Sequence, residues 1–232
     1  MTDQPFRTGF LLFPRLTQLD MTGPYEVLAR LPNAEVHLIW KTRQPVPSDH
    51  GLTILPTTTF EACPALDLIC VPGGPGVGPL LSDGTVLDFL RRVAAEARYV
   101  TSVGTGALVL GAAGLLQGRK AACHWMSREL LRSFGAEPTG ERVVTDGNLI
   151  TGGGVTAGID FALRVAAEVA GPETAQAIQL GIEYDPAPPF DAGSPERADP
   201  DLVETITQRA ASRQRERADQ VAQAAAALGA AA

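Results

Sequence analysis

The sequence has few cysteines, and their spacing excludes several functions. Three cysteines occur among 232 residues, none of them in a C-x-x-C pair: Cys63, Cys70 and Cys123. An odd number without paired spacing argues against a disulfide framework and against a zinc site, so we expect no metal. It also fits the reducing environment of the cytoplasm, which is the predicted location.

Basic residues and long apolar runs are also scarce. Lysine and arginine total 19 against 26 acidic residues, a net charge of -7, so no basic surface favours nucleic acid. No apolar run approaches the length of a membrane span, and the first five residues lack the form of a signal peptide. We therefore expect neither a nucleic-acid nor a membrane partner.

The remaining composition is that of an ordinary globular chain, 45% hydrophobic and 19% charged. Apolar strand patterns alternate with helical ones, which predicts an α/β fold: a flavodoxin-like, doubly wound, mostly parallel sheet with helices on both faces. We expect a single domain over 1–232, with a helical extension from about 199. Predicted strands cover 6–13, 35–41, 66–71 and 99–103, and predicted helices cover 25–31, 86–97, 156–170, 173–183 and 201–228.

Turn residues mark the remaining segments. Asp146-Gly147 between two apolar runs predicts a hairpin within 142–151. Short strands are expected within 45–59, helical structure over 127–134 closed by Gly135, and irregular structure over the proline-rich segment 185–195. Gly229 is the expected end of the last helix.

The segment 99–111 is the most informative part of the chain. A β-branched run is followed by Gly104, Thr105 and Gly106 and then by an Ala/Leu-rich helical pattern. A strand that turns this sharply into a helix forms a nucleophile elbow, in which the turn residue faces the site. Here the turn residue is Gly104, which has no side chain.

Other loops should meet the elbow at one edge of the sheet. Binding sites of parallel sheets lie at the carboxyl ends of the strands. Gly73-Gly74 follows one predicted strand, Gly152-Gly153-Gly154 follows another, and Asp20 lies in the turn after the first. The sequence therefore predicts a single site at this edge.

The motifs taken in order resemble those of the ThiJ/PfpI superfamily, which has the class I glutamine amidotransferase-like fold. The elbow, the Val71-Pro72-Gly73-Gly74 turn and the Thr151-Gly152-Gly153-Gly154 turn carry the resemblance. Within the superfamily the chain is most similar to the isocyanide hydratases. Four further segments carry that similarity: Gly9-Phe10-Leu11-Leu12-Phe13-Pro14, Gln18-Leu19-Asp20-Met21-Thr22-Gly23-Pro24, His37-Leu38-Ile39-Trp40-Lys41 and Pro186-Ala187-Pro188-Pro189-Phe190.

This resemblance implies a homodimeric lyase without cofactor that converts an isocyanide and water to an N-formamide. A cysteine thiolate at position 104 would attack the isocyanide carbon, Asp20 would handle the proton, and Thr105 would donate a hydrogen bond near the sulfur. The substrate pocket would be formed by Gly73, Gly74, His124, Gly153 and Val155.

Gly104 leaves three interpretations open. It reflects an engineered removal of the nucleophile, an inactive natural paralogue, or an ordinary turn glycine in a non-catalytic protein. Because the rest of the family pattern is intact, we favour loss of the nucleophile, and we expect this form to be inactive or nearly so. A glycine also relieves the backbone strain of an elbow.

The other candidates have structural interpretations too. Asp20 and Thr105 could be helix-capping residues, and His124 could be a structural hydrogen-bonding histidine. Cys123 is expected to be a small core residue and is only a remote candidate for a substitute nucleophile. The glycine turns do not match the dinucleotide fingerprint, so we expect no nucleotide cofactor.

A different class of function is a ligand-binding sensor, because related domains form the sensor half of AraC-type regulators. The single Ala/Gln/Arg-rich C-terminal helix and the acidic charge argue against a helix-turn-helix module here. Other activities of the superfamily, such as protease, chaperone or glyoxalase-like, are further alternatives.

Overall fold

A computed structural model describes residues 4–231. Its main sheet has seven strands in the order β10-β11-β7-β6-β1-β2-β5. Only the β10–β11 pair is antiparallel, and the other neighbours are parallel. The predicted doubly wound, mostly parallel sheet is therefore confirmed. The strands are β1 (Phe6–Leu11), β2 (Ala34–Trp40), β5 (Thr58–Thr59), β6 (Leu68–Val71), β7 (Tyr99–Val103), β10 (Val143–Asp146) and β11 (Leu149–Gly152).

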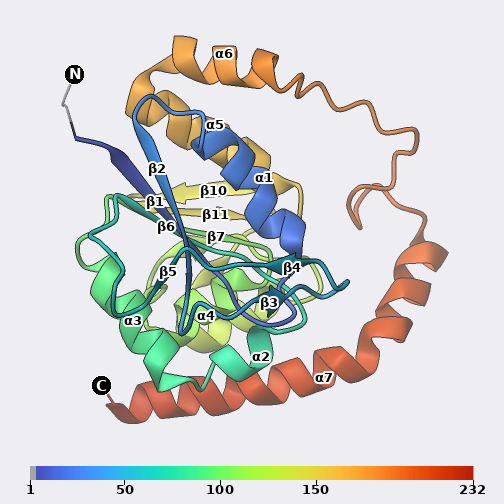
Figure 1. Cartoon of the computed structure of the whole chain (residues 1–232). Helices are drawn as coiled ribbons and strands as arrows, with labels where there is room; N and C mark the ends of the chain where they lie inside the picture. Colours follow the sequence, from blue (N-terminus) through green and yellow to red (C-terminus); the bar gives the residue numbers. More distant parts are fainter. Residues whose placement is uncertain (1–3, 232) are drawn as a thin grey trace.

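Helices cover both faces of this sheet (Figure 1). One face carries α1 (Gln18–Leu28), α5 (Ala157–Ala170) and, next to α5, α6 (Pro172–Gly181). The other face carries α2 (Val77–Leu80), α3 (Gly84–Ala94), α4 (Gly106–Ala112), the 3₁₀ helix η1 (Arg128–Phe134) and α7 (Pro200–Ala231). The long helix α7 returns across α2, α4 and η1, so the end of the chain lies against its middle.

Two small ladders lie outside the main sheet. Strands β3 (Val46–Pro47) and β4 (Thr53–Ile54) form a hairpin, which confirms the short strands expected within 45–59. Strands β8 (Lys120–Ala121) and β9 (Glu137–Pro138) pair in parallel. The hairpin around Asp146-Gly147 and the irregular segment 185–195 also occur as predicted.

The central strands are apolar because both of their faces are covered. All four residues of β6 are fully buried, and α4 between the sheet and α7 is buried along its whole length. Continuous apolar runs of this kind are typical of parallel strands between two helical layers. The core therefore extends on both sides of the sheet, and the site lies where the central strands end.

The first helix differs from its prediction. Its predicted start at residue 25 is wrong, because α1 begins at Gln18 and Pro24 lies inside it. A proline there removes only the hydrogen bond to the carbonyl of Asp20, and the helix continues past it. Asp20 is consequently in the first turn of a helix, and its expected place in a loop is wrong.

Several element ends also differ, and the helices predicted over 86–97 and 173–183 end earlier, at Ala94 and Gly181. Strand β1 stops at Leu11, so Leu12 and Phe13 are buried residues of the following loop. Helix α7 continues through Gly229 to Ala231, so Gly229 is not its end. A glycine inside an alanine-rich helix costs only about 1 kcal/mol, which the neighbouring alanines offset.

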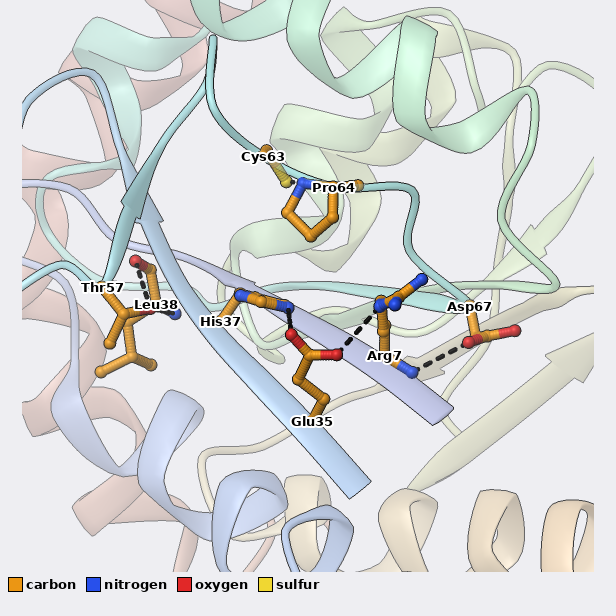
Figure 2. A network of polar contacts seen from close by, with 8 residues as sticks. All are labelled: Arg7, Glu35, His37, Leu38, Thr57, Cys63, Pro64 and Asp67. Atoms are coloured by element: carbon orange, nitrogen blue, oxygen red, sulfur yellow. Dashed lines mark hydrogen bonds and ion pairs between the residues drawn. The ribbon is translucent and has the colours of Figure 1, made fainter. Parts of the chain in front are cut away.

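A polar network joins β1, β2 and the start of β6 at the end of the sheet away from the elbow (Figure 2). The Arg7 backbone N–H donates to Asp67 at 2.8 Å, and the Arg7 side chain pairs with Glu35 at 2.9 Å. Glu35 also lies 3.1 Å from His37 Nε2. This network fixes the register of three adjacent strands and so holds their opposite ends in position.

The first residue of α4, Gly106, packs closely against the end of β6. A Cβ at Gly106 would lie 2.1 Å from the carbonyl oxygen of Val71, whereas one at Gly84, the first residue of α3, would meet nothing within 4 Å. Gly106→Ala should lower the free energy of unfolding by about 3 kcal/mol, at the upper end for overpacking, because backbone atoms must move. Gly84→Ala, the matched control, should change it by less than about 1 kcal/mol. Urea unfolding measures both, and equal stabilities would contradict this packing.

Candidate active site

The predicted elbow is present. Strand β7 ends at Val103, and Gly104 turns the chain into α4 with a φ of 55°. The Gly104 N–H donates to the carbonyl of Gly152 at 2.9 Å, which ties the turn to the end of β11. A Cβ built on Gly104 would lie 3.0 Å from Asp20 Oδ2. Any side chain at position 104 would therefore point at the Asp20 carboxyl group.

Asp20 is buried, with 2% of its surface exposed. Its Oδ2 accepts a hydrogen bond from the Gly73 N–H at 2.8 Å, and its Oδ1 is a buried oxygen without a protein partner in the described chain. Burial raises the pKa of this carboxyl group from 3.8 to about 7; the Gly73 N–H opposes the rise and the charge of Asp49 adds to it. Asp20 can thus both give and take a proton near neutral pH.

Thr105 and the Gly73-Gly74 turn form the neighbouring wall. The Gly74 N–H donates to Thr105 Oγ1 at 3.0 Å. A Cβ on Gly73 would lie 2.6 Å from the Thr105 nitrogen and 2.8 Å from Asp20 Oδ2, so only glycine fits there. The hydroxyl of Thr105 faces this turn and makes no capping bond within α4. Its predicted alternative role as a side-chain cap is not observed.

These residues line a cavity of about 360 Å³. Six of the eight predicted site residues form its wall: Asp20, Gly74, Gly104, Thr105, His124 and Val155. Gly73 lies behind it through the bond to Asp20, and the Gly153 carbonyl would lie 3.8 Å from a Cβ at position 104. The structure therefore brings all four predicted loops to one place.

His124 lies in the same cavity but makes no contact with Asp20 or Thr105 in the described hydrogen bonds. Its Nδ1 accepts a hydrogen bond from the Met126 N–H at 3.4 Å. Burial, followed by the positive charges of Arg217 and Arg213, lowers the pKa of His124. The imidazole is therefore neutral at pH 7, with its remaining proton on Nε2.

Several wall residues were not predicted from the sequence. Helix α7 contributes Arg213, Gln214 and Arg217, and the β3–β4 hairpin contributes Asp49, which accepts a 2.8 Å hydrogen bond from Thr17 Oγ1. No local motif marks these positions, because the long helix reaches the cavity only through tertiary packing. From the sequence alone, the arginine pattern of α7 is typical of a solvent-exposed helix face.

The thiols of the chain are poorly placed for nucleophilic chemistry. Cys123 is buried in the core, as expected, and burial raises its pKa to about 12. Burial likewise raises the pKa of Cys70 to about 12. Neither thiol forms a thiolate near neutral pH, so neither replaces a missing nucleophile.

The described residues contain neither a cluster of metal ligands nor a membrane-spanning helix. Over 4–231 no group of three or more His, Cys, Asp or Glu side chains could hold a metal ion. In the same range no helix has the length and apolarity needed to cross a bilayer.

The doubly wound sheet, the strand–glycine–helix elbow and the buried carboxyl group opposite the elbow define an α/β protein of the nucleophile-elbow class. The DJ-1/PfpI family matches residues 7–168, which is more than half of the chain. The chain belongs to the DJ-1/PfpI family, and the family prediction from its motifs is confirmed.

Individual relatives show which members of the family this chain resembles. The chain is 63% identical to isonitrile hydratase of Pseudomonas putida over 203 residues, covering 88% of this chain and 89% of the relative. A crystal structure of a ThiJ/PfpI family protein from Pseudomonas syringae matches with a TM-score of 0.91 and 41% identity, covering 94% of this chain and 91% of that one. The HTH-type transcriptional regulator GbdR of Pseudomonas aeruginosa is 31% identical, over 78% of this chain and only 51% of the regulator.

The raised pKa of Asp20 predicts a specific pH dependence of stability. In the unfolded chain the carboxyl group ionises near 3.8, and in the folded chain near 7, so the folded state binds more protons between these values. The stability that Asp20 contributes is therefore fully present below about pH 3.8 and is lost as the pH rises through about 7. Between these values the free energy of unfolding falls by roughly 1.4 kcal/mol per pH unit.

Asp20→Asn should remove this dependence. Urea unfolding of both proteins between pH 4.5 and 7.5 should show the variant gaining stability relative to the parent chain as the pH rises. The other titrating groups are common to both proteins and cancel in the difference. A difference that stays constant over this range would contradict the raised pKa.

Proposed function

We propose that this chain is an isocyanide hydratase whose covalent catalysis is interrupted at position 104. The 63% identity to isonitrile hydratase of Pseudomonas putida over 88% of the chain is the observation that supports this most. The cavity adds to it, because a side chain at Gly104 would face the Asp20 carboxyl at 3.0 Å. The substrate is an isocyanide, the product is an N-formamide, and no cofactor takes part.

In a form with cysteine at position 104, the thiolate sulfur attacks the terminal carbon of the isocyanide. Neutral Asp20 gives its proton to that carbon, which leaves a thioimidate, R–N=CH–S–Cys. Water then adds to the same carbon and one of its protons goes to the nitrogen. As the C–S bond breaks, the new hydroxyl group gives its proton to the Asp20 carboxylate and becomes the formyl oxygen. The N-formamide leaves and the thiolate returns, so atoms and charges balance over the cycle.

Each remaining residue has a role in this proposal. Thr105 and the Gly73-Gly74 turn shape the space around the sulfur, and the Thr105 hydroxyl gives it a hydrogen bond. His124, Gly153 and Val155 border the isocyanide substituent. The low polarity that raises the pKa of Asp20 keeps its proton available near pH 7.

With glycine at position 104 no atom can form the covalent bond. Thr105 does not substitute, because an alcohol needs a strong base and its hydroxyl is bonded to the Gly73-Gly74 turn. Water attacking with help from Asp20 lacks the nucleophilicity of a thiolate. The cavity still accepts the substrate, so this form binds isocyanides and turns them over slowly if at all.

Gly104→Cys should switch on formamide production from cyclohexyl isocyanide. Because φ at this position is 55°, the new side chain should cost about 1–3 kcal/mol of stability. Gas chromatography of the formamide, with Gly104→Ala as the control that adds a Cβ but no nucleophile, measures the effect. In the Gly104→Cys background, Asp20→Asn should lower kcat about a hundredfold.

Equal rates for the parent chain and Gly104→Cys would show that the nucleophile lies elsewhere. No formamide from either would contradict the proposed reaction. Full activity of the Asp20→Asn double variant would remove Asp20 from the proton transfer.

A sensor without turnover is the second candidate function. The 31% identity to the regulator GbdR over 78% of this chain, together with Gly104, favours it over other non-catalytic roles. A form that binds isocyanides and stays inactive after Gly104→Cys would support this alternative.

We further propose that the chain works as one cytoplasmic domain with a C-terminal helical extension, in a homodimer. Helix α7 has 32 residues, and its first ten are almost all exposed, including Leu202 and Ile206 at 44% and 39%. Apolar side chains at i and i+4 form one stripe of a helix, which is the usual form of a helix–helix interface.

Light scattering after size exclusion should give twice the mass of one chain at micromolar concentration. Leu202→Glu with Ile206→Glu should shift the mass toward the monomer, because two charges would enter the apolar stripe. Leu180→Glu, at a leucine of α6 that is 81% exposed, is the matched control and should leave the mass unchanged. A monomeric parent chain would end this proposal.

A further inference from the structure

Helix α7 places a buried guanidinium group in the wall of the cavity. Arg217 is only 7% exposed and lines the same cavity as Gly104 and Asp20. Its Nη1 donates to Ser127 Oγ at 3.1 Å and its Nη2 to the Gly74 carbonyl at 3.5 Å. Ser127 Oγ in turn donates to Gln214 Oε1 at 3.0 Å. The contacts of Arg217 are thus all with neutral acceptors.

The positive charge of this group has no directly paired carboxylate among the described residues, although the charge of Glu216 favours it. Within residues 4–230, neither Arg217 nor Arg213 forms an ion pair with a carboxylate, although eleven such pairs occur elsewhere. A guanidinium carries five N–H donors, and only two bonds use those of Arg217. A buried and unpaired charge is costly, and proteins keep one where a ligand supplies the opposite charge.

A second arginine adds to the positive potential at this end of the cavity. Arg213, one helical turn before Arg217, also lines the wall. Burial is the main cause that lowers the pKa of His124 and of Arg217; the charges of Arg217 and Arg213 add to it at His124, and the charge of Arg213 adds to it at Arg217. Two cations that repel each other across one pocket are stabilised together by a bound anion.

The Gly73-Gly74 turn connects this basic end to the position that faces Asp20. The Gly73 N–H bonds to Asp20, and the carbonyl of the next residue, Gly74, accepts from Arg217. Since Gly104 and Arg217 line the same cavity, a substituent that extends from a reacting carbon beside Gly104 can reach Arg217. In a cavity of about 360 Å³ only a short spacer fits between the two.

We propose that the substrate of this site is a small isocyanide bearing a carboxylate a few bonds from the isocyano group, with the carboxylate held by Arg217 and Arg213. A planar carboxylate matches the two parallel N–H groups of a guanidinium. With a pKa of about 7, the Asp20 carboxyl group is mostly protonated at pH 6 and then repels such a substrate little. This inference rests on the proposed isocyanide chemistry and specifies its substrate class.

Binding to the unaltered chain tests the carboxylate site without catalysis. Isothermal titration at pH 6.5 compares isocyanoacetate with its methyl ester, which differs by the loss of the charge. Isocyanoacetate should bind about ten- to a hundredfold more tightly. Arg217→Gln and Arg213→Gln should each reduce this preference, whereas Arg215→Gln, an exposed arginine of the same helix outside the cavity, should retain it.

Arg213 is exposed, so its variant is expected to fold even if Arg217→Gln does not. Arg217→Lys keeps the charge and should retain part of the preference, and circular dichroism reports folding of each variant. Equal binding of acid and ester, or a preference that survives both Arg→Gln variants, would overturn the carboxylate site. Absence of binding by both compounds would also overturn the carboxylate site.

Turnover by Gly104→Cys separates this inference from the proposed function. If kcat/KM is higher for isocyanoacetate than for the ester, and Arg213→Gln abolishes the difference, the result supports both the carboxylate site and isocyanide hydration. Equal kcat/KM values overturn the carboxylate site and leave isocyanide hydration intact. Preferential binding of isocyanoacetate without turnover of any isocyanide would overturn the hydratase and support an anion site.

Discussion

The hydrogen bond from the Gly73 N–H to Asp20 Oδ2, 2.8 Å long and buried, is the contact on which the rest of the site depends. It joins the first turn of α1 to the loop after β6, and so fixes the carboxyl group opposite the elbow. The approach is close because residues 73 and 104 have no side chains to obstruct it. The bond satisfies one oxygen only, and burial of the whole group holds its pKa near 7. This contact sets the position of Asp20, whereas burial, opposed by the Gly73 N–H, raises its proton affinity.

The cavity around this contact has two chemically different ends. Asp20 and position 104 form an end suited to proton transfer and bond formation, and Arg217 and Arg213 form an end suited to an anion. Helix α7 supplies the second end through Arg217, which is buried, whereas its first ten residues are almost all exposed. In the proposed carboxylate site, the middle of this helix would serve ligand recognition and its start the proposed dimer.

Local sequence patterns predicted the sheet and the loops that meet at its edge, because strand periodicity, glycine turns and the Asp146-Gly147 hairpin are short-range signals. They placed the start of the first helix at residue 25, although α1 begins at Gln18 and continues through Pro24. They also missed Arg217, since nothing near it in the chain shows that α7 folds back across α4. The chemistry of the elbow was readable from sequence, and the specificity of the pocket required the fold.

Burial beside position 104 should make Asp20 a proton donor and acceptor near neutral pH. Carbon-detected NMR of the carboxyl groups, with Asp20→Asn used to assign the resonance, measures its titration directly. The account predicts a midpoint of about 7, with Asp20 still protonated at pH 6. A midpoint near 3.8, the value of a carboxyl group in water, would contradict it and leave Asp20 a structural acceptor for Gly73.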